Sequence, residues 1–366
     1  MTLIVTVVVV ALAFEYINGF NDTANSIATV VSTKVLSPRQ ALVLAAVTNL
    51  FGALLGTAVA KTITGGLMDA GVVSITSVIV VCALLGAISW NLLTWWHGLP
   101  SSSSHALIGG LCGAALAAAH NRWNVIIWSQ PSAAHWYLGR GLLWKVIVPM
   151  FLSPLLGLVC GFLLMALLYV ALRHKRPSRV NAFFGVAQIF SAASMGVMHG
   201  TNDAQKTMGI IALALLSATK AGTFDHLPGW LEFLRSPLPL PGKDLEIAAW
   251  IKVVCALTMA SGTAMGGWRI IKTLGHKMVK LHPINGFAAE ASSATVIGLA
   301  SLLGIPVSTT HNISAAIMGV GCARRFNAIK WTVVERMVWA WVLTIPAAGA
   351  MGYALVRLAQ AYGWTR

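Results

Sequence analysis

Charged residues are scarce in this sequence. Only 10% of its 366 residues are Asp, Glu, Lys or Arg, and 57% are hydrophobic. A soluble globular domain carries about 25% charged residues, and a core this large would need more polar residues to cover it. The scarcity of charge excludes a soluble globular protein. We therefore expect an all-α, polytopic membrane protein.

Cysteines are also few. The five are scattered through apolar runs without the CxxC spacing of a metal or redox site: Cys82, Cys112, Cys160, Cys255 and Cys322. We expect them to be small buried hydrophobes, with neither disulfides nor a bound metal or other cofactor.

The N-terminus lacks the basic region and the small-residue cleavage site of a signal peptide, so we expect its apolar run to be a retained span. Apolar runs of about 18 to 25 residues recur along the chain and predict about ten to twelve membrane segments. The expected boundaries are 2–32, 40–60, 72–96, 98–119, 141–172, 182–217, 246–267, 284–303, 304–322 and 331–362. Segments 98–119 and 304–322 are rich in Gly and Ser and either cross the bilayer or re-enter as hairpins.

The net charge of +15 comes from basic residues in short loops between these segments. One side of the predicted membrane holds fourteen basic residues and one acid, Glu335, whereas the other holds ten basic and five acidic residues. Cytoplasmic loops carry the excess of Lys and Arg. The first side is therefore predicted to be cytoplasmic, with both termini outside. The basic residues do not indicate nucleic-acid binding.

Two motifs occur twice, in the same order. An Asn-Asp motif at 18–22 returns at 199–203, and a Gly-x-Pro-Ser/Thr-His motif at 98–105 returns at 304–311. A short basic segment separates the copies. The duplication predicts two inverted repeats, at 1–172 and 182–366, joined by a cytoplasmic linker at 173–181. This plan is common in transporters, which place the substrate near the bilayer midplane.

Asp22 and Asp203 lie near the middle of apolar segments, each directly after an asparagine. A charge at that depth costs at least about 2.5–3.5 kcal/mol, which indicates a function. The nearby Gly19 and Gly200 predict that both helices unwind here and expose carbonyl groups that can bind a cation. A buried Asp that caps a helix is the alternative.

The Ser/Thr runs at 101–104 and 308–310 each follow a proline and precede a run of small residues. This pattern is typical of a helix that begins inside the membrane. Free N–H groups and the helix dipole favour an anion there, and hydroxyl groups add donors for oxyanion oxygens. N-capping without a ligand is the alternative.

Four further residues lie near these motifs. His105 and His311 directly follow the hydroxyl runs and either orient the loops or carry protons. Glu15 lies seven residues before Asp22, on roughly the same helix face. Glu290 precedes a small-residue face suited to close helix packing. Either glutamate relays protons, binds a cation or is a buried acid paired with a helix end.

Lys206 differs from its counterpart in the first half, which is Asn25. Asparagine offers a neutral oxygen, whereas lysine adds a positive charge three residues from Asp203. A Lys-Asp pair suits anion binding or proton coupling, and it would exclude sodium from that half of the site.

The chain resembles the Pit family of inorganic phosphate transporters. The family's repeated Asn-Asp signature is present at 18–25 and 199–206, and its repeated Pro-x-Ser-x-Thr/Ser-His signature at 100–105 and 306–311. The Asp-Ala-Gln-Lys form is similar to the bacterial low-affinity branch. The resemblance implies a cation-coupled phosphate symporter of the bacterial inner membrane that binds phosphate between the hydroxyl loops and the Asn-Asp pairs. It favours protons over sodium, and it allows a metal–phosphate complex as cargo and a homodimer in the lipid.

The resemblance and the residue patterns together assign roles. The predicted phosphate-binding residues are Asp22, Ser102, Ser103, Ser104, Asp203, Ser308, Thr309 and Thr310. The predicted cation-coupling residues are Asn21, Asp22, Asn25, Asn202, Asp203, Lys206 and Glu290. The predicted supporting residues are Glu15, His105 and His311.

Three alternatives remain open at this point. Sodium could replace protons as the coupling ion. Sulfate could be the substrate, although a protonated phosphate can donate a hydrogen bond to an aspartate and sulfate cannot. Paired aspartates or a Ser-His pair could also belong to an intramembrane hydrolase, but the duplication and the absence of a G-x-S-x-G context favour transport.

Overall fold

The structure is a computed structural model that describes residues 2–65, 76–131, 139–225, 227–237 and 246–364. These residues form helices, turns and loops, and the one pairing of extended backbone among them is an isolated bridge between Gln130 and Arg140. The predicted all-α class is confirmed. The five cysteines are free thiols. The predicted boundary at 72 lies outside the described residues.

The helices of the two halves follow the same order. In the first half they are α1 (Thr2–Ser32), α2 (Pro38–Leu54), α3 (Ala58–Gly65), α4 (Ser77–Trp96), α5 (Ser103–Ala118) and α6 (Val148–Leu172), which a π-helical turn η3 (Leu143–Ile147) precedes. In the second half they are α7 (Pro177–Lys220), α8 (Ala249–Met265), α9 (Trp268–Lys272) with the π-helical turn η5 (Thr273–Lys277), α10 (Pro283–Leu302), α11 (Thr309–Arg324) and α12 (Trp331–Ala361). Among the described residues, short 3-10 helices at Trp123–Val125, Gly229–Leu234 and Phe326–Ala328 lie in loops.

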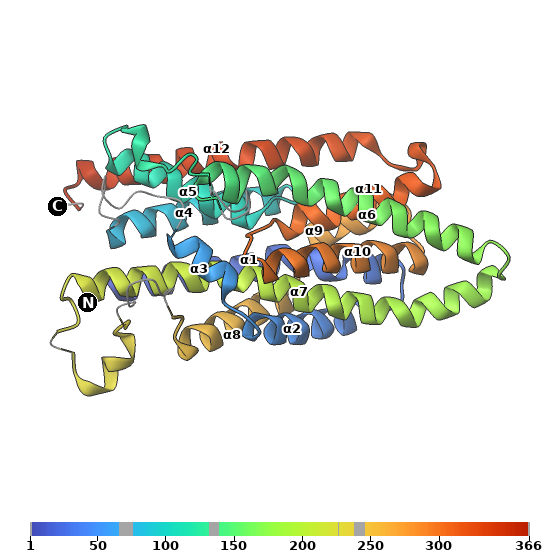
Figure 1. Ribbon diagram of the computed structural model, residues 1–366, viewed down its shortest axis with the longest axis horizontal. Helices are drawn as coiled ribbons and strands as arrows, with labels where there is room; N and C mark the ends of the chain where they lie inside the picture. The colour runs from blue at the N-terminus through green and yellow to red at the C-terminus, as the bar shows by residue number, and fades with distance from the viewer. Residues whose placement is uncertain (1, 66–75, 132–138, 226, 238–245, 365–366) are drawn as a thin grey trace.

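Long apolar helices make this a multi-pass membrane protein. Among the described residues five helices are long and apolar enough to cross a bilayer, and α8 with α9 and η5 forms a sixth span that is bent by 58°. Figure 1 shows both chain ends at one end of the long axis and the turn between α6 and α7 at the other. We term these ends the termini face and the linker face.

Two helical hairpins contain the segments 98–119 and 304–322, which were predicted either to cross the bilayer or to re-enter it. Helix α4 packs on α5, and α10 packs on α11. Figure 1 shows the first hairpin toward the termini face and the second toward the linker face. Helices α5 and α11 have 16 residues each, about 24 Å, which is less than the roughly 30 Å of hydrocarbon. The first residues of both helices, Ser103 and Thr309, are buried inside the protein.

Helices of each half pack against helices of the other half. Helix α5 packs against α12, while its counterpart α11 packs against α6. In the same way α1 packs against α8, and α7 packs against α2. Each hairpin is thus completed by a helix from the other half, and the halves share one interior.

The prediction that the helices unwind at the Asn-Asp pairs is wrong. Helices α1 and α7 run without interruption through Asp22 and Asp203. Gly19 and Gly200 serve packing instead: a Cβ at Gly19 would lie 2.4 Å from the carbonyl oxygen of Met259, and one at Gly200 would lie 2.3 Å from that of Asn49. The absence of a side chain lets α8 and α2 approach closely.

The breaks occur in the helices that cross these glycines. Residues 55–57 separate α2 from α3, and residues 266–267 separate α8 from α9. Helix α7 also begins earlier than the predicted 182, at Pro177, because proline suits the first helical position, where no N–H partner is needed. The non-helical part of the connection between the halves is therefore 173–176.

Candidate functional site

The two Ser/Thr loops are helix N-termini that meet in the interior. Ser102 is the N-cap of α5 and accepts a hydrogen bond from the His105 N–H at 3.3 Å. Ser308 is the N-cap of α11 and accepts from the His311 N–H at 3.2 Å. The predicted capping role therefore belongs to these two serines. The hydroxyl groups of the first helical turn remain for other partners.

Asp22 joins the two hairpins. Its carboxylate accepts a hydrogen bond from Ser103 Oγ at 3.1 Å and another from Thr310 Oγ1 at 3.0 Å. One donor belongs to each hairpin, and all three side chains are buried. The aspartate of α1 therefore fixes the two loop tips relative to each other.

Asp203 occupies the equivalent place on α7 but has a different set of partners. It accepts from Thr309 Oγ1 at 2.9 Å and from the ammonium group of Lys206. The same ammonium group also donates to Ser104 Oγ and, at 3.1 Å, to the carbonyl oxygen of Val307. The predicted Lys-Asp contact is present, and the lysine is buried.

Asn25 is the counterpart of Lys206 and reaches the second hairpin. Its amide group donates to Thr310 Oγ1 at 3.0 Å and lies 3.3 Å from Thr309 Oγ1. Its Oδ1 atom is buried and has no hydrogen-bond partner among the described residues.

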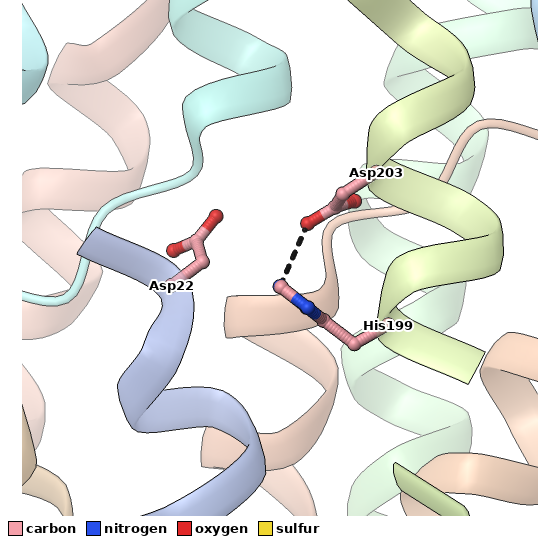
Figure 2. Close-up of side chains that lie close together, drawn as sticks. All are labelled: Asp22, His199 and Asp203. Carbon is pink, nitrogen blue, oxygen red and sulfur yellow. Dashed lines mark ion pairs between the residues drawn. The ribbon is translucent and has the colours of Figure 1, made fainter. Parts of the chain in front are cut away.

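His199 completes the centre of the site, and the sequence analysis assigned it no role. Its Nε2 lies 3.1 Å from Asp203 Oδ2, and its Nδ1 lies 3.0 Å from Asn49 Oδ1. Figure 2 shows His199 and Asp203 on α7 facing Asp22 on α1, and one ligand atom from each lies within 4.8 Å of the others. The signal was the spacing of four residues between His199 and Asp203, which places both on one helix face. Two carboxylates and an imidazole could bind a divalent metal.

The asparagines of the Asn-Asp pairs do not join this cluster. Asn21 donates to the carbonyl oxygen of Asn91 at 3.3 Å, and Asn202 donates to Ser301 Oγ at 2.9 Å. They attach α1 to α4 and α7 to α10. These contacts position the helices that carry the aspartates.

The two intramembrane glutamates lie outside the cluster as well. Glu290 on α10 accepts hydrogen bonds from the hydroxyl groups of Thr29 and Ser191 and from the Gln188 amide at 3.3 Å. Glu15 accepts from the Thr207 hydroxyl, while its Oε1 has no partner among the described residues. Both side chains are fully buried.

His105 and His311 lie behind the hydroxyl groups and contact each other. Their ring centroids are 4.8 Å apart, and His311 stacks on Trp341 at 4.3 Å. The indole N–H of Trp341 donates to the carbonyl oxygen of Pro100 at 3.0 Å. The supporting role of both histidines stays a prediction.

The arrangement defines a class of protein. Two helix N-termini with hydroxyl donors can bind an oxyanion, and the adjoining carboxylates can bind protons or a cation. These groups are buried between the N-terminal ends of the second helices of two hairpins, in a multi-pass protein. Together they define a membrane transporter for a small anion.

Comparison with known proteins identifies the family. The profile of the phosphate transporter family, PHO4, matches residues 18–179 and 170–352, so the chain belongs to this family. A probable low-affinity inorganic phosphate transporter of Bacillus subtilis is 42% identical over 352 residues, which cover 96% of each chain. Proteins of the same description from Mycobacterium tuberculosis and Rhizobium meliloti are 44% and 43% identical, over 98% and 94% of this chain and 79% and 93% of their own lengths.

A solved structure has the same fold. The sodium-dependent phosphate transporter aligns with a TM-score of 0.79, covers 99% of this chain and 100% of its own, and is 22% identical in sequence. The resemblance to phosphate transporters is confirmed. The relatives are transporters, so the chain is not an enzyme and the hydrolase alternative is excluded.

Proposed function

We propose that this protein imports inorganic phosphate across the bacterial inner membrane by proton-coupled alternating access. The family and the relatives' names support phosphate as the substrate. The excess of basic residues near the linker face supports a cytoplasmic linker with both termini outside.

The observation that carries the proposal is that three hydroxyl protons of the site are already in use. Ser103 and Thr310 donate to Asp22, and Thr309 donates to Asp203. A hydroxyl group has one proton to donate. Phosphate oxygens that bind these hydroxyl groups must therefore displace the two carboxylates as acceptors.

Displacement would leave two buried carboxylates beside an anion. Burying a charge without a partner is costly, and nearby charges of the same sign raise the cost further. A proton or another cation must therefore enter with phosphate. This requirement links the movement of the anion to the movement of the cation. Asp22, which has no basic hydrogen-bond partner of its own, is the proposed proton acceptor.

Lys206 favours protons over sodium. Its ammonium group already occupies the space between Asp203 and Ser104, so a sodium ion between these two residues would meet a positive charge. When phosphate binds, the same ammonium group can turn from Asp203 to a phosphate oxygen. Glu15, seven residues before Asp22 on α1, and Glu290 on α10 are proposed to relay protons.

A metal–phosphate complex is the second candidate cargo, and one observation favours it. Asp22, His199 and Asp203 can direct ligand atoms at one point. Two carboxylates and one imidazole suit a transition metal better than magnesium, which prefers oxygen ligands. The metal would enter as part of the substrate.

Uptake of labelled phosphate into proteoliposomes tests the coupling ion. We expect uptake to follow an imposed pH gradient at constant sodium, and equal sulfate to compete poorly. Uptake that follows sodium and ignores the pH gradient would overturn proton coupling.

The Asp22→Asn variant tests the proton acceptor. Because it loses a hydrogen-bonded charge while keeping its shape, gradient-driven uptake should fall roughly 10- to 100-fold. Undiminished gradient-driven uptake by this variant would remove Asp22 from the coupling mechanism.

A further inference from the structure

Helices α3 and α9 directly follow the breaks after α2 and α8, and α3 and the segment that begins with α9 each contact a hairpin of the other half. Thr62 on α3 donates its hydroxyl proton to the carbonyl oxygen of Gly304 at 2.7 Å. Thr273, at the start of η5 directly after α9, donates to the carbonyl oxygen of Gly98 at 2.8 Å. The two hydrogen bonds are equivalent in the repeat.

Both acceptors lie at the start of a Ser/Thr loop. Gly98 and Gly304 adopt φ values of 65° and 66°, a region that glycine occupies without strain. Each glycine ends the turn after the first hairpin helix and leads into the loop that carries the site's hydroxyl groups. A hydrogen bond at this glycine therefore holds the loop in place.

The two contacts lie on opposite sides of the site. Figure 1 shows α3 nearer the termini face and α9 nearer the linker face. Thr62 therefore contacts the second hairpin from a helix nearer the termini face. Thr273 contacts the first hairpin from next to a helix nearer the linker face.

The helix that carries Thr62 is also bonded to a residue next to the site. Gln205 on α7 accepts hydrogen bonds from the N–H groups of Val59 at 2.7 Å and Ala60 at 3.3 Å, at the start of α3. Gln205 directly precedes Lys206 and is buried. The position of α3 is therefore tied to the helix turn that carries Asp203 and Lys206.

The linker-side contact is the more enclosed of the two. Thr273 is 4% exposed, whereas Thr62 is half-buried. Arg269 on α9 adds a hydrogen bond to the Trp96 carbonyl oxygen, and its guanidinium group lies 4.4 Å from the centre of the Trp96 ring. The counterpart of Arg269 in the first half is an alanine, Ala58. The termini side should therefore open more readily than the linker side.

We propose that Thr62 and Thr273 are positioning residues for transport. Thr62 closes the second Ser/Thr loop toward the termini face, Thr273 closes the first loop toward the linker face, and each releases its glycine in turn during a transport cycle. The proposal builds on the proposed alternating access, but its structural part can be measured without phosphate.

Hydrogen exchange followed by mass spectrometry measures the two contacts separately. The Leu99 N–H bonds to Thr94 O at 2.9 Å, and the Ile305 N–H bonds to Ala300 O at 2.9 Å, so each amide reports on its own loop. We expect Thr62→Val to speed exchange roughly fivefold at Ile305 and to leave Leu99 unchanged, since one hydrogen bond is lost. Thr273→Val should do the reverse.

Matched variants separate the hydroxyl from a general loss of stability. Thr62→Ser and Thr273→Ser keep the donor and should restore wild-type exchange. Thr295→Val removes an exposed hydroxyl that bonds only within its own helix, to Ala291 O, and should change neither loop. If a valine variant does not fold, the smaller Thr→Ala change at the same position is used instead. The proposal is overturned if both variants affect the same loop, or if neither affects any loop.

Phosphate uptake then tests the role in transport. Because each variant weakens one closed state, we expect both to lower the maximal uptake rate about threefold to tenfold while each serine variant restores it. If each variant speeds exchange in its own loop but uptake is undiminished, the two contacts are supported and their role in the transport cycle is overturned. A failure of phosphate transport by the wild-type protein would instead overturn the proposed function, and the exchange measurement would still stand.

Discussion

Lys206 and Asn25 occupy equivalent positions in the two halves, but only Lys206 separates an aspartate from a hydroxyl group of the opposite hairpin. The ammonium group of Lys206 donates to both Asp203 and Ser104. Asn25 donates to Thr310 and leaves that residue's own proton free to reach the aspartate of α1. The site is thus symmetric in its hydroxyl groups and asymmetric in its charge.

Replacing Lys206 with asparagine should make the two halves alike. In the Lys206→Asn variant Asp203 loses its resident cation, so we expect proton-driven uptake to fall at least about tenfold, the loss typical of a hydrogen bond to a charged group. Sodium-stimulated uptake should appear, because an amide oxygen replaces the ammonium group. Uptake under separate sodium and pH gradients checks both effects, with Lys175→Asn as the control in the exposed linker. Unchanged proton-driven uptake would contradict the assigned role.

Alanine variants of the neighbouring residues Ser102 and Ser103 should differ in their effects on protein stability and on phosphate binding. Ser102 caps α5, so Ser102→Ala should lower the free energy of unfolding by about 0.5–2 kcal/mol. Ser103 donates to Asp22 from the first helical turn, so Ser103→Ala should raise the KM for phosphate several-fold, and by more than Ser102→Ala does. Thermal unfolding and uptake kinetics on both variants check this. Equal effects of the two changes on KM would show that the loop acts as one unit.

Alanine at Gly19 should destabilise the protein. The added Cβ would lie 2.4 Å from a backbone oxygen of α8, which cannot move aside as a side chain could. We expect Gly19→Ala to cost about 1–3 kcal/mol, as overpacking does. Gly185→Ala is the matched control, because its Cβ would meet nothing within 4 Å and alanine favours the interior of α7 by up to about 1 kcal/mol. Thermal unfolding in detergent should move in opposite directions for the two variants.

His199 should matter more for a metal–phosphate complex than for phosphate alone. His199→Gln keeps a polar side chain but removes the imidazole ligand, so we expect zinc-stimulated phosphate uptake to fall about tenfold or more. Uptake in the presence of a chelator should fall much less. The measurement compares the two conditions for wild type and variant. Equal losses in both would assign His199 to phosphate binding or to the support of Asp203, and not to a metal.

Much of the fold could be predicted because it depends on local pattern. The first span was expected at 2–32, where α1 lies, and the proline before each Ser/Thr run marked where α5 and α11 begin. The predicted unwinding at the Asn-Asp pairs was wrong because glycine in an apolar helix fits either a break or a close crossing. Only the partner helix decides between them, and that partner comes from the other half of the chain.

The candidate site, too, could be predicted in part from local pattern, and the rest depends on packing. Helix spacing could place Asp203 and Lys206 on one face, and the repeat could pair Asn25 with Lys206. Spacing alone could not show that Asn21 turns toward α4 while Asp22 faces the hairpins, because adjacent residues on a helix point in different directions and packing selects between them. His199 was visible in the motif but was assigned no role.

The packing of helices from one half against helices of the other has a consequence for biosynthesis. Helix α5 carries the first anion loop but packs against α12, which follows every other helix of the two halves in the chain. Segments generally fold in the order in which the ribosome releases them. Until α12 has been inserted, the first hairpin therefore lacks this packing partner, and its polar tip can contact only helices made earlier. The complete binding site is among the last parts of the molecule to form.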